Sequence, residues 1–327
     1  MPSRTVLVTG AGGFIGGHLV ERLVREGARV RAFCRYNSRN DRGTLDWLTP
    51  EIQREIDVVM GDLRDVESVS GAVAGVEVVF HLGAQIAIPY SYVNARDYVE
   101  TNVLGTLNVA QAALQHDVQR LVHTSTSEVY GTAQAAPITE SHPLEAQSPY
   151  AASKIGADKL IDSFHRSHGL PAVILRPFNT YGPRQSARAV IPTIITQALA
   201  GPIVRLGALD PRRDLSYVED TAGGFMAAAR AEAVVGSTIQ LGTGESVSVG
   251  DIVRLVGDLV GRPLQVEADE DRVRPPHSEV QVLLSDPTRA RELCGWEAVV
   301  GLRDGLTETI AWYEANLDRY RSDEYVT

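Results

Sequence analysis

Short apolar runs recur along the chain at intervals that leave room for a helix between one run and the next. Each run is rich in valine, isoleucine or leucine, and the runs begin near residues 5, 29, 56, 76, 120, 172 and 238. Near-continuous apolar strands of this kind are buried on both faces, as in a parallel sheet covered by helices. The pattern therefore predicts an α/β fold with a doubly wound parallel sheet.

The pattern loosens after residue 179, where proline, glycine and arginine follow one another at shorter intervals. Residues 248–261 and 302–317 still have the periodicity of amphipathic helices. We therefore expect a sheet domain over residues 1–179, joined by a return strand near 237–241. Residues 180–327 are expected to form mainly a smaller C-terminal α/β lobe.

A glycine-rich loop, "TGAGGFIGG", follows the first apolar run directly. It places Gly10, Gly13 and Gly16 at a strand-to-helix crossing, with Phe14 and Ile15 between them. Glycine permits a tight turn and lets backbone N–H groups approach a pyrophosphate at the positive end of a helix. A glycine-rich loop can also be a plain turn, but its place after the first strand predicts the dinucleotide loop of a Rossmann domain.

Further cofactor contacts are expected where the third and fourth strands end, because ligands bind at the carboxyl ends of the strands in such sheets. The residues at these two ends are Asp62, Leu63, Leu82 and Ala84. We assign Asp62 to the adenine end of the cofactor, with an ordinary loop carboxylate as the alternative.

The end of the second strand separates the two nicotinamide cofactors. A carboxylate there binds the ribose 2′-hydroxyl of NAD, whereas an arginine accommodates the 2′-phosphate of NADP. Cys34 occupies the expected acidic position, and Arg35, Asn37 and Ser38 follow it. This segment favours NADP, and NAD is the alternative if Asp41 reaches the ribose.

Composition narrows the classes of partner and the compartment. The chain has 31 basic and 41 acidic side chains and a net charge of −10, which argues against nucleic-acid binding. Two cysteines cannot form a disulfide framework, and their scarcity fits a reducing compartment. The first strand leaves no room for a signal peptide, and no apolar run approaches about 18 residues, so we expect a cytoplasmic protein away from membranes.

The histidines His81, His123 and His277 lack metal-ligand spacing, so we expect no metal.

The motif "SPYAASK" places Tyr150 and Lys154 four residues apart, on one face of a predicted helix. A lysine ammonium beside the phenol favours the phenolate, which allows the tyrosine to remove a proton from an alcohol. Alone, this pair is typical of an ordinary helix surface. With the phosphate loop and the "HTSTSE" cluster about 25 residues upstream, it indicates a catalytic site.

These motifs, together with "RPFNTYGPRQ", "RDLSYVEDT" and "VRPPHSEV", resemble the extended short-chain dehydrogenase/reductase superfamily. Within it, the chain is similar to the NAD(P)-dependent nucleotide-sugar epimerases and dehydratases, over nearly its whole length. The resemblance implies an NAD(P)-binding Rossmann domain, a C-terminal nucleotide-sugar lobe, and a homodimer through a four-helix bundle, here of residues 93–115 and 149–168. It also implies Tyr150 as the base, Lys154 as its partner and ribose ligand, and Thr126 as a hydrogen-bond partner of the sugar 4-hydroxyl.

Glu128, just beyond a buried strand, has the position of an ordinary residue at a helix N-terminus. The resemblance suggests another role, because sugar 4,6-dehydratases carry Thr-Asp-Glu or Thr-Ser-Glu where this chain has Thr126, Ser127 and Glu128. A 4,6-dehydratase must remove the carbon 5 proton and expel the carbon 6 hydroxyl, steps that an epimerase omits. Ser127 is a poor acid, so we expect Glu128 itself to protonate the leaving hydroxyl. The motif predicts conversion of an NDP-hexose to its 4-keto-6-deoxy product, with tightly bound NADP that is recycled.

Arginines in the C-terminal lobe are candidate ligands of the substrate diphosphate, because guanidinium groups match phosphate oxygens. Arg213 and Arg274 are the first candidates, and Arg188 and Asn179 are expected on the same wall. Each arginine can instead be a solvated surface charge.

Other functions remain open at the level of the sequence. Within the enzyme class they are a 4-epimerase, a UDP-glucuronate-type decarboxylase and a 5,6-dehydratase, and outside it a dinucleotide-binding sensor. The segments "RYNSRNDRGTLDWL" and "IAIPYSY" look most like dehydratases acting on UDP- or GDP-linked N-acetylglucosamine in legionaminic-acid-type pathways.

Overall fold

A seven-stranded sheet forms the centre of the computed structural model, which describes residues 1–269, 272, 275 and 278–320. Every neighbouring pair of its strands is parallel. In spatial order the strands are β11 (Thr238–Leu241), β6 (Ala172–Pro177), β5 (Arg120–Thr124), β4 (Val78–His81), β1 (Thr5–Thr9), β2 (Arg29–Arg35) and β3 (Ile56–Gly61). The strand order reverses between β1 and β4, so the sheet is doubly wound and the predicted fold class is confirmed.

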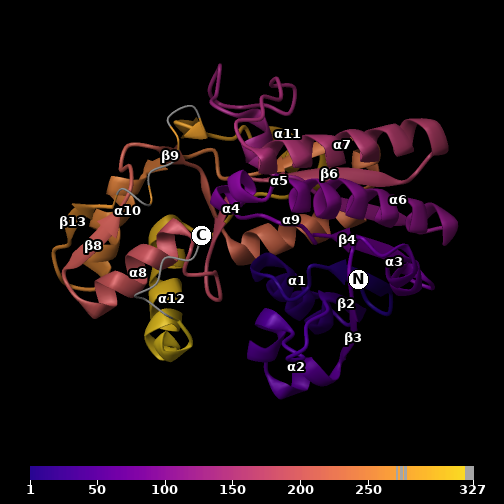
Figure 1. Cartoon of the computed structure of the whole chain (residues 1–327), viewed down its shortest axis with the longest axis horizontal. Helices are drawn as coiled ribbons and strands as arrows, with labels where there is room; N and C mark the ends of the chain where they lie inside the picture. Colours follow the sequence, from indigo (N-terminus) through magenta and orange to yellow (C-terminus); the bar gives the residue numbers. More distant parts are fainter. Residues whose placement is uncertain (270–271, 273–274, 276–277, 321–327) are drawn as a thin grey trace.

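Helices cover both faces of this sheet (Figure 1). One face carries α1 (Phe14–Arg25), α9 (Val218–Arg230) and α11 (Thr288–Cys294), and the other carries α3 (Val66–Val73), α6 (Gly105–Gln115) and α7 (Pro149–His168). Each face has its own apolar core, because every strand side chain points to one face or the other. Burial on both sides explains why the strands read as continuous apolar runs.

A smaller group of elements lies beside the sheet, at the left of Figure 1. Its helices are α8 (Val190–Ala200), α10 (Val249–Leu259) and α12 (Leu302–Ala315), and its parallel strand pair is β8 (Ile203–Leu206) with β13 (Gln265–Ala268). Two small sheets join it to the rest, β7 (Asn179–Tyr181) with β10 (Leu215–Tyr217), and β9 (Arg212–Arg213) with β12 (Val247–Ser248) and β14 (Val282–Leu283). These helices and strands enclose a third apolar core.

Short elements fill the connections between the strands and the long helices. They are η1 (Gly43–Trp47), α2 (Pro50–Arg54), α4 (Ile88–Val93), α5 (Ala95–Tyr98), η2 (Val99–Leu104), η3 (Ser127–Tyr130), η4 (Glu232–Val234) and η7 (Leu317–Arg319). In the described part of the chain, no helix combines the length and the apolar character needed to cross a membrane.

The strands and the helix 149–168 agree with the sequence prediction, and β11 is the expected return strand. The predicted helix over residues 93–115 is wrong at its start and in its regularity. Asn94 separates α4 from α5, and η2 is a π-helical turn. Asn102 in this turn accepts from the backbone N–H of Gln85 (2.7 Å) and donates to the Ser153 hydroxyl (2.9 Å), and such tertiary contacts have no signature in the helical pattern. The division into domains at residue 179 stays a prediction.

Candidate active site

The loop between β1 and α1 has the backbone geometry that the glycines predicted. Gly10 has a φ of +66°, and a side chain there would lie 2.8 Å from the backbone of Gly83 at the end of β4. A Cβ on Gly16 would overlap the Gly10 carbonyl oxygen. Gly13 caps α1 without a side-chain hydrogen bond, so no side chain occupies the positive end of this helix. The loop thus fits the pyrophosphate of a dinucleotide.

The segment after β2 folds back onto this loop. Thr44 donates its hydroxyl to the Gly13 carbonyl oxygen (2.8 Å), and its backbone N–H donates to the Gly12 carbonyl oxygen (2.9 Å). The Asn37 amide holds the intervening turn by donating to the Asp41 carbonyl oxygen (2.7 Å), and the Asp41 carboxylate accepts from the Gly43 N–H (2.7 Å). Asn37 and Asp41, both expected near the ribose, therefore also shape the turn.

The end of β2 carries a cysteine and an arginine. Burial raises the pKa of Cys34 to about 11, so this residue is a neutral thiol at the position where NAD-binding sheets carry a carboxylate. Arg35 and Ser38 are exposed beside it. Asp62 accepts from the Arg64 guanidinium (Nη2, 2.6 Å), and this hydrogen bond lowers the pKa of Asp62, with a smaller contribution from the charge of Arg35.

The predicted contacts at the next strand ends lie at the same edge of the sheet. Gly83 donates its N–H to the Thr9 hydroxyl (3.0 Å), which fixes the segment of Leu82 and Ala84 at the end of β4 against the end of β1. A side chain on Gly83 would meet Leu63, so Leu63 packs directly behind this segment.

The turn after β5 carries Thr126, Ser127 and Glu128. Thr126 caps η3, and its hydroxyl accepts from the backbone N–H of Glu128 (3.2 Å). Ser127 is buried, whereas Glu128 is partly exposed. Glu128 thus lies at a helix N-terminus, as expected for an ordinary residue. Its carboxylate does not cap the helix, because the Thr126 hydroxyl does so.

Tyr150 and Lys154 lie on the first turns of α7, which Ser148 caps by accepting from the Ala151 N–H (3.1 Å). Burial raises the pKa of Tyr150, a hydrogen bond with Thr126 lowers it in part, and the charge of Glu128 raises it again. The tyrosine, Thr126 and Glu128 therefore act on one another across the space between η3 and α7.

The predicted electrostatic role of Lys154 beside Tyr150 stays a prediction, and burial opposes it. Its ammonium donates to the Thr124 carbonyl oxygen (2.6 Å), and burial lowers its pKa to about 8. We expected the lysine to favour the phenolate, whereas the pKa of Tyr150 lies above its ordinary value. The reason is that burial disfavours the charged forms of both groups.

Two clefts adjoin each other between the phosphate loop and the C-terminal lobe. One, of about 620 Å³, is lined by Gly12, Gly13 and Phe14 of the phosphate loop, and the other, of about 480 Å³, is lined by Asn179 and Arg213. Gln185, Arg188, Thr193 and Arg272 line both clefts. The phosphate loop and the candidate substrate residues thus border one continuous region.

The substrate candidates differ in their surroundings. The Asn179 side-chain oxygen is buried without a hydrogen-bond partner, and Arg188 is exposed. Arg213 is buried and pairs with Glu279 (2.9 Å). Arg274 and His277 lie outside the described residues. No group of three or more histidine, cysteine, aspartate or glutamate side chains in the described residues is arranged to hold a metal ion.

The family model for GDP-mannose 4,6 dehydratase matches residues 7–309. The chain belongs to this family. It is 34% identical to a dTDP-glucose 4,6-dehydratase of Streptomyces griseus over 315 residues, covering 94% of this chain and 93% of that protein. It is 33% identical to a UDP-glucose 4-epimerase of Mycolicibacterium smegmatis, covering 94% and 97%. The structure resembles that of DesIV, a dTDP-glucose 4,6-dehydratase from Streptomyces venezuelae with NAD and TYD bound, with a TM-score of 0.85, 30% identity, and coverage of 97% and 98%.

Membership in the GDP-mannose 4,6-dehydratase family confirms the predicted resemblance and the prediction of an enzyme. The individual roles of the site residues stay predictions. Some cleft residues escaped the sequence reasoning, among them Gln185 and Arg272, which no motif marks by its chemistry. The sequence did not predict Trp47 as a cleft residue either. It lines the cleft of the phosphate loop and stacks on Trp312 (5.6 Å between ring centroids).

Proposed function

We propose that this chain is an NDP-sugar 4,6-dehydratase that converts an NDP-hexose to the 4-keto-6-deoxy sugar. The observation that carries the proposal is the place of Glu128. It lies on the turn capped by Thr126, and its charge acts on the Tyr150 phenol. Elimination requires a second acid or base beside the tyrosine that removes the 4-hydroxyl proton during oxidation.

The phosphate loop with Gly10, Gly13 and Gly16 would hold the cofactor pyrophosphate. When bound, the nicotinamide supplies a hydride acceptor for carbon 4 and the same hydride for carbon 6, so the cofactor is recycled. Lys154, on the first turns of α7, would bind the nicotinamide ribose, as the family resemblance implies.

Tyr150 takes the proton of the 4-hydroxyl, and Thr126 hydrogen-bonds the same oxygen. The raised pKa of Tyr150 keeps the phenol protonated. Proton removal therefore depends on positive charge brought close to the phenol, and Lys154 carries that charge below a pH of about 8, its own pKa.

Glu128 removes the proton from carbon 5, which is acidic once carbon 4 is a ketone, and protonates the departing 6-hydroxyl, directly or through water. Ser127 is buried and is a poor acid, so it orders the turn and leaves proton transfer to Glu128. Glu128 passes the carbon 5 proton to the 6-hydroxyl, which leaves as water. After the hydride returns to carbon 6, carbon 5 takes a proton from solvent, and Tyr150 releases the 4-hydroxyl proton to solvent, so that one water is lost overall.

The diphosphate of the substrate would lie in the cleft of Asn179 and Arg213, with Arg188 at its exposed side. The unpaired Asn179 oxygen needs a donor, and a sugar hydroxyl in the cleft can supply one. The preference for UDP- or GDP-linked N-acetylglucosamine stays a prediction.

The preference for NADP rests on exposed Arg35 and on the thiol of Cys34 where a carboxylate would select NAD. NAD is the alternative, and it is bound in the DesIV structure. Titration of the purified protein with both cofactors decides the question, and tighter binding of NAD would overturn the NADP preference.

The homodimer, the cytoplasmic location and the absence of nucleic-acid partners also stay predictions. Val99 and Leu104 of η2 are exposed apolar side chains on the helices expected to form the four-helix bundle. Burial of such side chains favours association.

The decisive test is incubation in D₂O with UDP-, GDP-, dTDP- and CDP-linked hexoses, followed by mass spectrometry and NMR of the products. We expect a 4-keto-6-deoxy product with deuterium at carbon 5. A product of unchanged mass inverted at carbon 4 would instead establish the 4-epimerase, the function named for one relative. Loss of carbon dioxide would indicate a decarboxylase, an exocyclic alkene a 5,6-dehydratase, and cofactor binding without turnover a sensor.

A further inference from the structure

A buried carboxylate lies one helical turn beyond Lys154. Tyr150, Lys154 and Asp158 are spaced by four residues along α7, so their side chains leave the helix on one face. Their exposed fractions are 8%, 3% and 2%. A fully buried carboxylate is costly unless it is paired, so the partners of Asp158 reveal its role.

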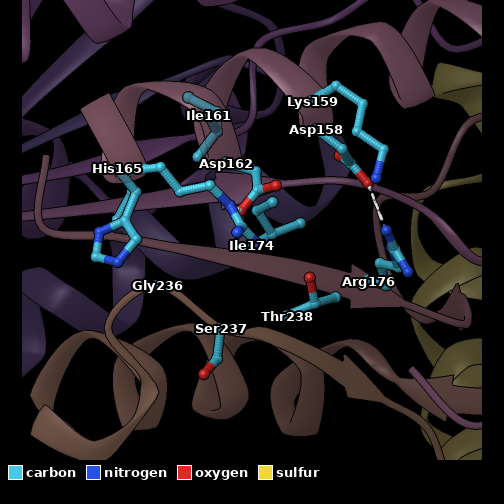
Figure 2. Close-up of a pocket in the computed structure, with 12 residues that line it drawn as sticks. Asp158, Lys159, Ile161, Asp162, His165, Ile174, Arg176, Gly236, Ser237 and Thr238 are labelled. Carbon is cyan, nitrogen blue, oxygen red and sulfur yellow. Dashed lines mark hydrogen bonds and ion pairs between the residues drawn. The ribbon is translucent and has the colours of Figure 1, made fainter. Parts of the chain in front are cut away.

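The partners of Asp158 come from the strands and the catalytic turn. Its Oδ2 atom accepts from the Ser125 hydroxyl (2.8 Å) and from Nη2 of Arg176 (2.9 Å), and its Oδ1 atom lies 3.3 Å from Nε2 of His123. Figure 2 shows Asp158 on the helix and Arg176 from the strand beside it pointing toward each other. One carboxylate thus connects α7 with β5, β6 and the start of the turn.

Asp158 does not belong to the ligand clefts. It lines a separate cleft of about 190 Å³ between α7, β6 and β11, together with Lys159, Asp162 and His165 (Figure 2). The lining of this cleft includes none of the predicted cofactor, catalytic or substrate residues. Asp158 therefore acts on the reaction through the residues that it contacts and through those that its charge reaches.

The first such residue is Ser125, which immediately precedes Thr126, Ser127 and Glu128. Its hydroxyl donates to the Asp158 carboxylate, and its backbone N–H donates to the Leu175 carbonyl oxygen (2.6 Å). The turn that carries Thr126 and Glu128 is therefore anchored at the residue before it by this carboxylate.

The charge of Asp158 also reaches Lys154, which lies one helical turn away on the same face of α7. Burial lowers the pKa of Lys154 to about 8, and the charge of Asp158 opposes this effect. Other groups surround the two residues: His81 on β4, His123 on β5, Arg176 on β6, and Tyr130 and Glu128 on η3. Burial raises the pKa of Asp158, but hydrogen bonding with His123 and the charges of Arg176 and Lys154 lower it below its ordinary value. Asp158 is thus ionised, and it supplies negative charge on the inner side of the ammonium.

We propose that Asp158 is a positioning residue for the catalytic site: it keeps Lys154 protonated from within the fold and anchors the turn of Thr126 and Glu128 through Ser125. The proposal rests on the proposed function for its meaning in catalysis. Its electrostatic part concerns the cofactor site alone, because Lys154 is the expected ribose ligand, and it is therefore testable without turnover.

The test is the pH dependence of NADPH and NADH binding to the Asp158→Asn variant, measured by nicotinamide fluorescence. Asparagine keeps the volume and a hydrogen bond to Ser125 but removes the charge. Wild-type affinity is expected to fall above a pH of about 8, where Lys154 loses its proton. In the variant this fall should move to lower pH by about 1 unit or more, the size of shift that a neighbouring opposite charge produces. At the acid end of the range the two affinities should agree within a few fold.

The matched control is Asp162→Asn, one turn further along α7, where the carboxylate forms a surface ion pair with Arg166. This variant should bind cofactor with the wild-type pH profile. A uniform loss of affinity at every pH in Asp158→Asn would show a merely structural role and overturn the proposal, as would an unchanged profile.

Asp158→Asn leaves Arg176 without its buried partner and can fail to fold for that reason. The double variant Asp158→Asn/Arg176→Gln removes both charges, and its profile is compared with that of Arg176→Gln. The same downward shift of the alkaline fall supports the proposal, and identical profiles of the two variants overturn it. A protein that shows the shift but dehydrates no NDP-hexose would retain this role of Asp158 and refute the proposed function instead.

Discussion

At the scale of the residue, burial decides the chemistry of the predicted catalytic pair. It raises the pKa of Tyr150 and lowers that of Lys154, and in both cases it favours the neutral form. The sequence showed that the two side chains share a helix face, but it could not show how completely they are buried. The phenol therefore needs positive charge close to it before it can lose its proton.

The Glu128→Gln variant should separate elimination from oxidation. The change keeps the shape of the side chain and removes its ability to take the carbon 5 proton, so product formation should fall about 100-fold or more. Reduced nicotinamide should still form slowly, because Tyr150, Lys154 and Thr126 remain. Near-ultraviolet absorbance and NMR of the product follow the two steps.

The control for this variant is Glu145→Gln, an exposed carboxylate on the loop that follows η3, which should leave both steps unchanged. Tyr150→Phe should instead suppress the first appearance of reduced nicotinamide. Full dehydration by Glu128→Gln would assign Glu128 to the helix N-terminus alone.

His81 makes the stability of the protein sensitive to acid. Its ring nitrogens lie 2.8 Å from the Thr9 hydroxyl and 3.0 Å from the Thr106 hydroxyl, and burial keeps its pKa well below 6.5. Below a pH of about 6.5, His81 binds a proton in the unfolded chain but stays neutral in the native protein. The free energy of unfolding should therefore decrease as the pH is lowered, by at most about 1.4 kcal/mol per pH unit. Urea unfolding at several pH values measures this slope.

The slope should be smaller in His81→Gln and unchanged in His168→Gln, because His168 is exposed at the end of α7. Equal slopes in wild type and His81→Gln would show that other groups account for the acid sensitivity.

At the scale of the element, the sequence predicted the junction of β1 and α1 but not the π-helical turn η2. Glycine spacing predicted the junction, because close backbone approach leaves room for no other residue. The π-helical turn depends on Asn102, whose partners Gln85 and Ser153 belong to other elements. Only the folded chain brings these partners together.

The Gly16→Ala variant tests the phosphate loop. Its Cβ would overlap the Gly10 carbonyl oxygen, so α1 must move away from the end of β1. We expect at least about tenfold weaker binding of either nicotinamide cofactor, equivalent to about 1.4 kcal/mol. Titration by fluorescence measures the loss.

Gly71→Ala in α3 is the control, since a Cβ there meets no atom within 4 Å and alanine favours a helix. It should bind cofactor like the wild type and unfold at the same or a higher temperature. Unchanged affinity in Gly16→Ala would argue that the pyrophosphate is bound elsewhere.

At the scale of the whole molecule, the candidate site is an assembly of distant segments. The phosphate loop lies near the N-terminus, the predicted catalytic residues in the middle, and Arg213 and Arg272 in the C-terminal half. Trp47 stacks on Trp312, and Arg319 lies over the Trp47 ring (5.4 Å from its centroid). The segment after β2 therefore contacts the C-terminal lobe beside the phosphate loop. Substrate and cofactor can therefore meet only in the folded chain.

The predicted homodimer is testable at the surface of η2, where Leu104 is 47% exposed. Leu104→Glu places a charge at the centre of the expected four-helix bundle, and burying an unpaired charge disfavours association. Light scattering at micromolar concentration should then give the monomer mass, whereas wild type gives the dimer.

The matched control is Val299→Glu, since Val299 is 76% exposed on the loop before α12. It should leave the mass of the assembly unchanged. A monomeric wild type, or a Leu104→Glu variant that remains dimeric, would contradict the four-helix bundle.

The sequence by itself determined the parallel sheet, the place of the phosphate loop and the position of Tyr150 and Lys154 on one helix face. These features depend on local periodicity and on residue types whose spacing is read directly from the chain. The tertiary structure decided the raised pKa of Tyr150, the contact of Lys154 with Thr124, and the anchoring of Ser125 by Asp158. Such properties depend on burial and on partners distant in sequence, because charge and hydrogen bonding act through space and not along the chain.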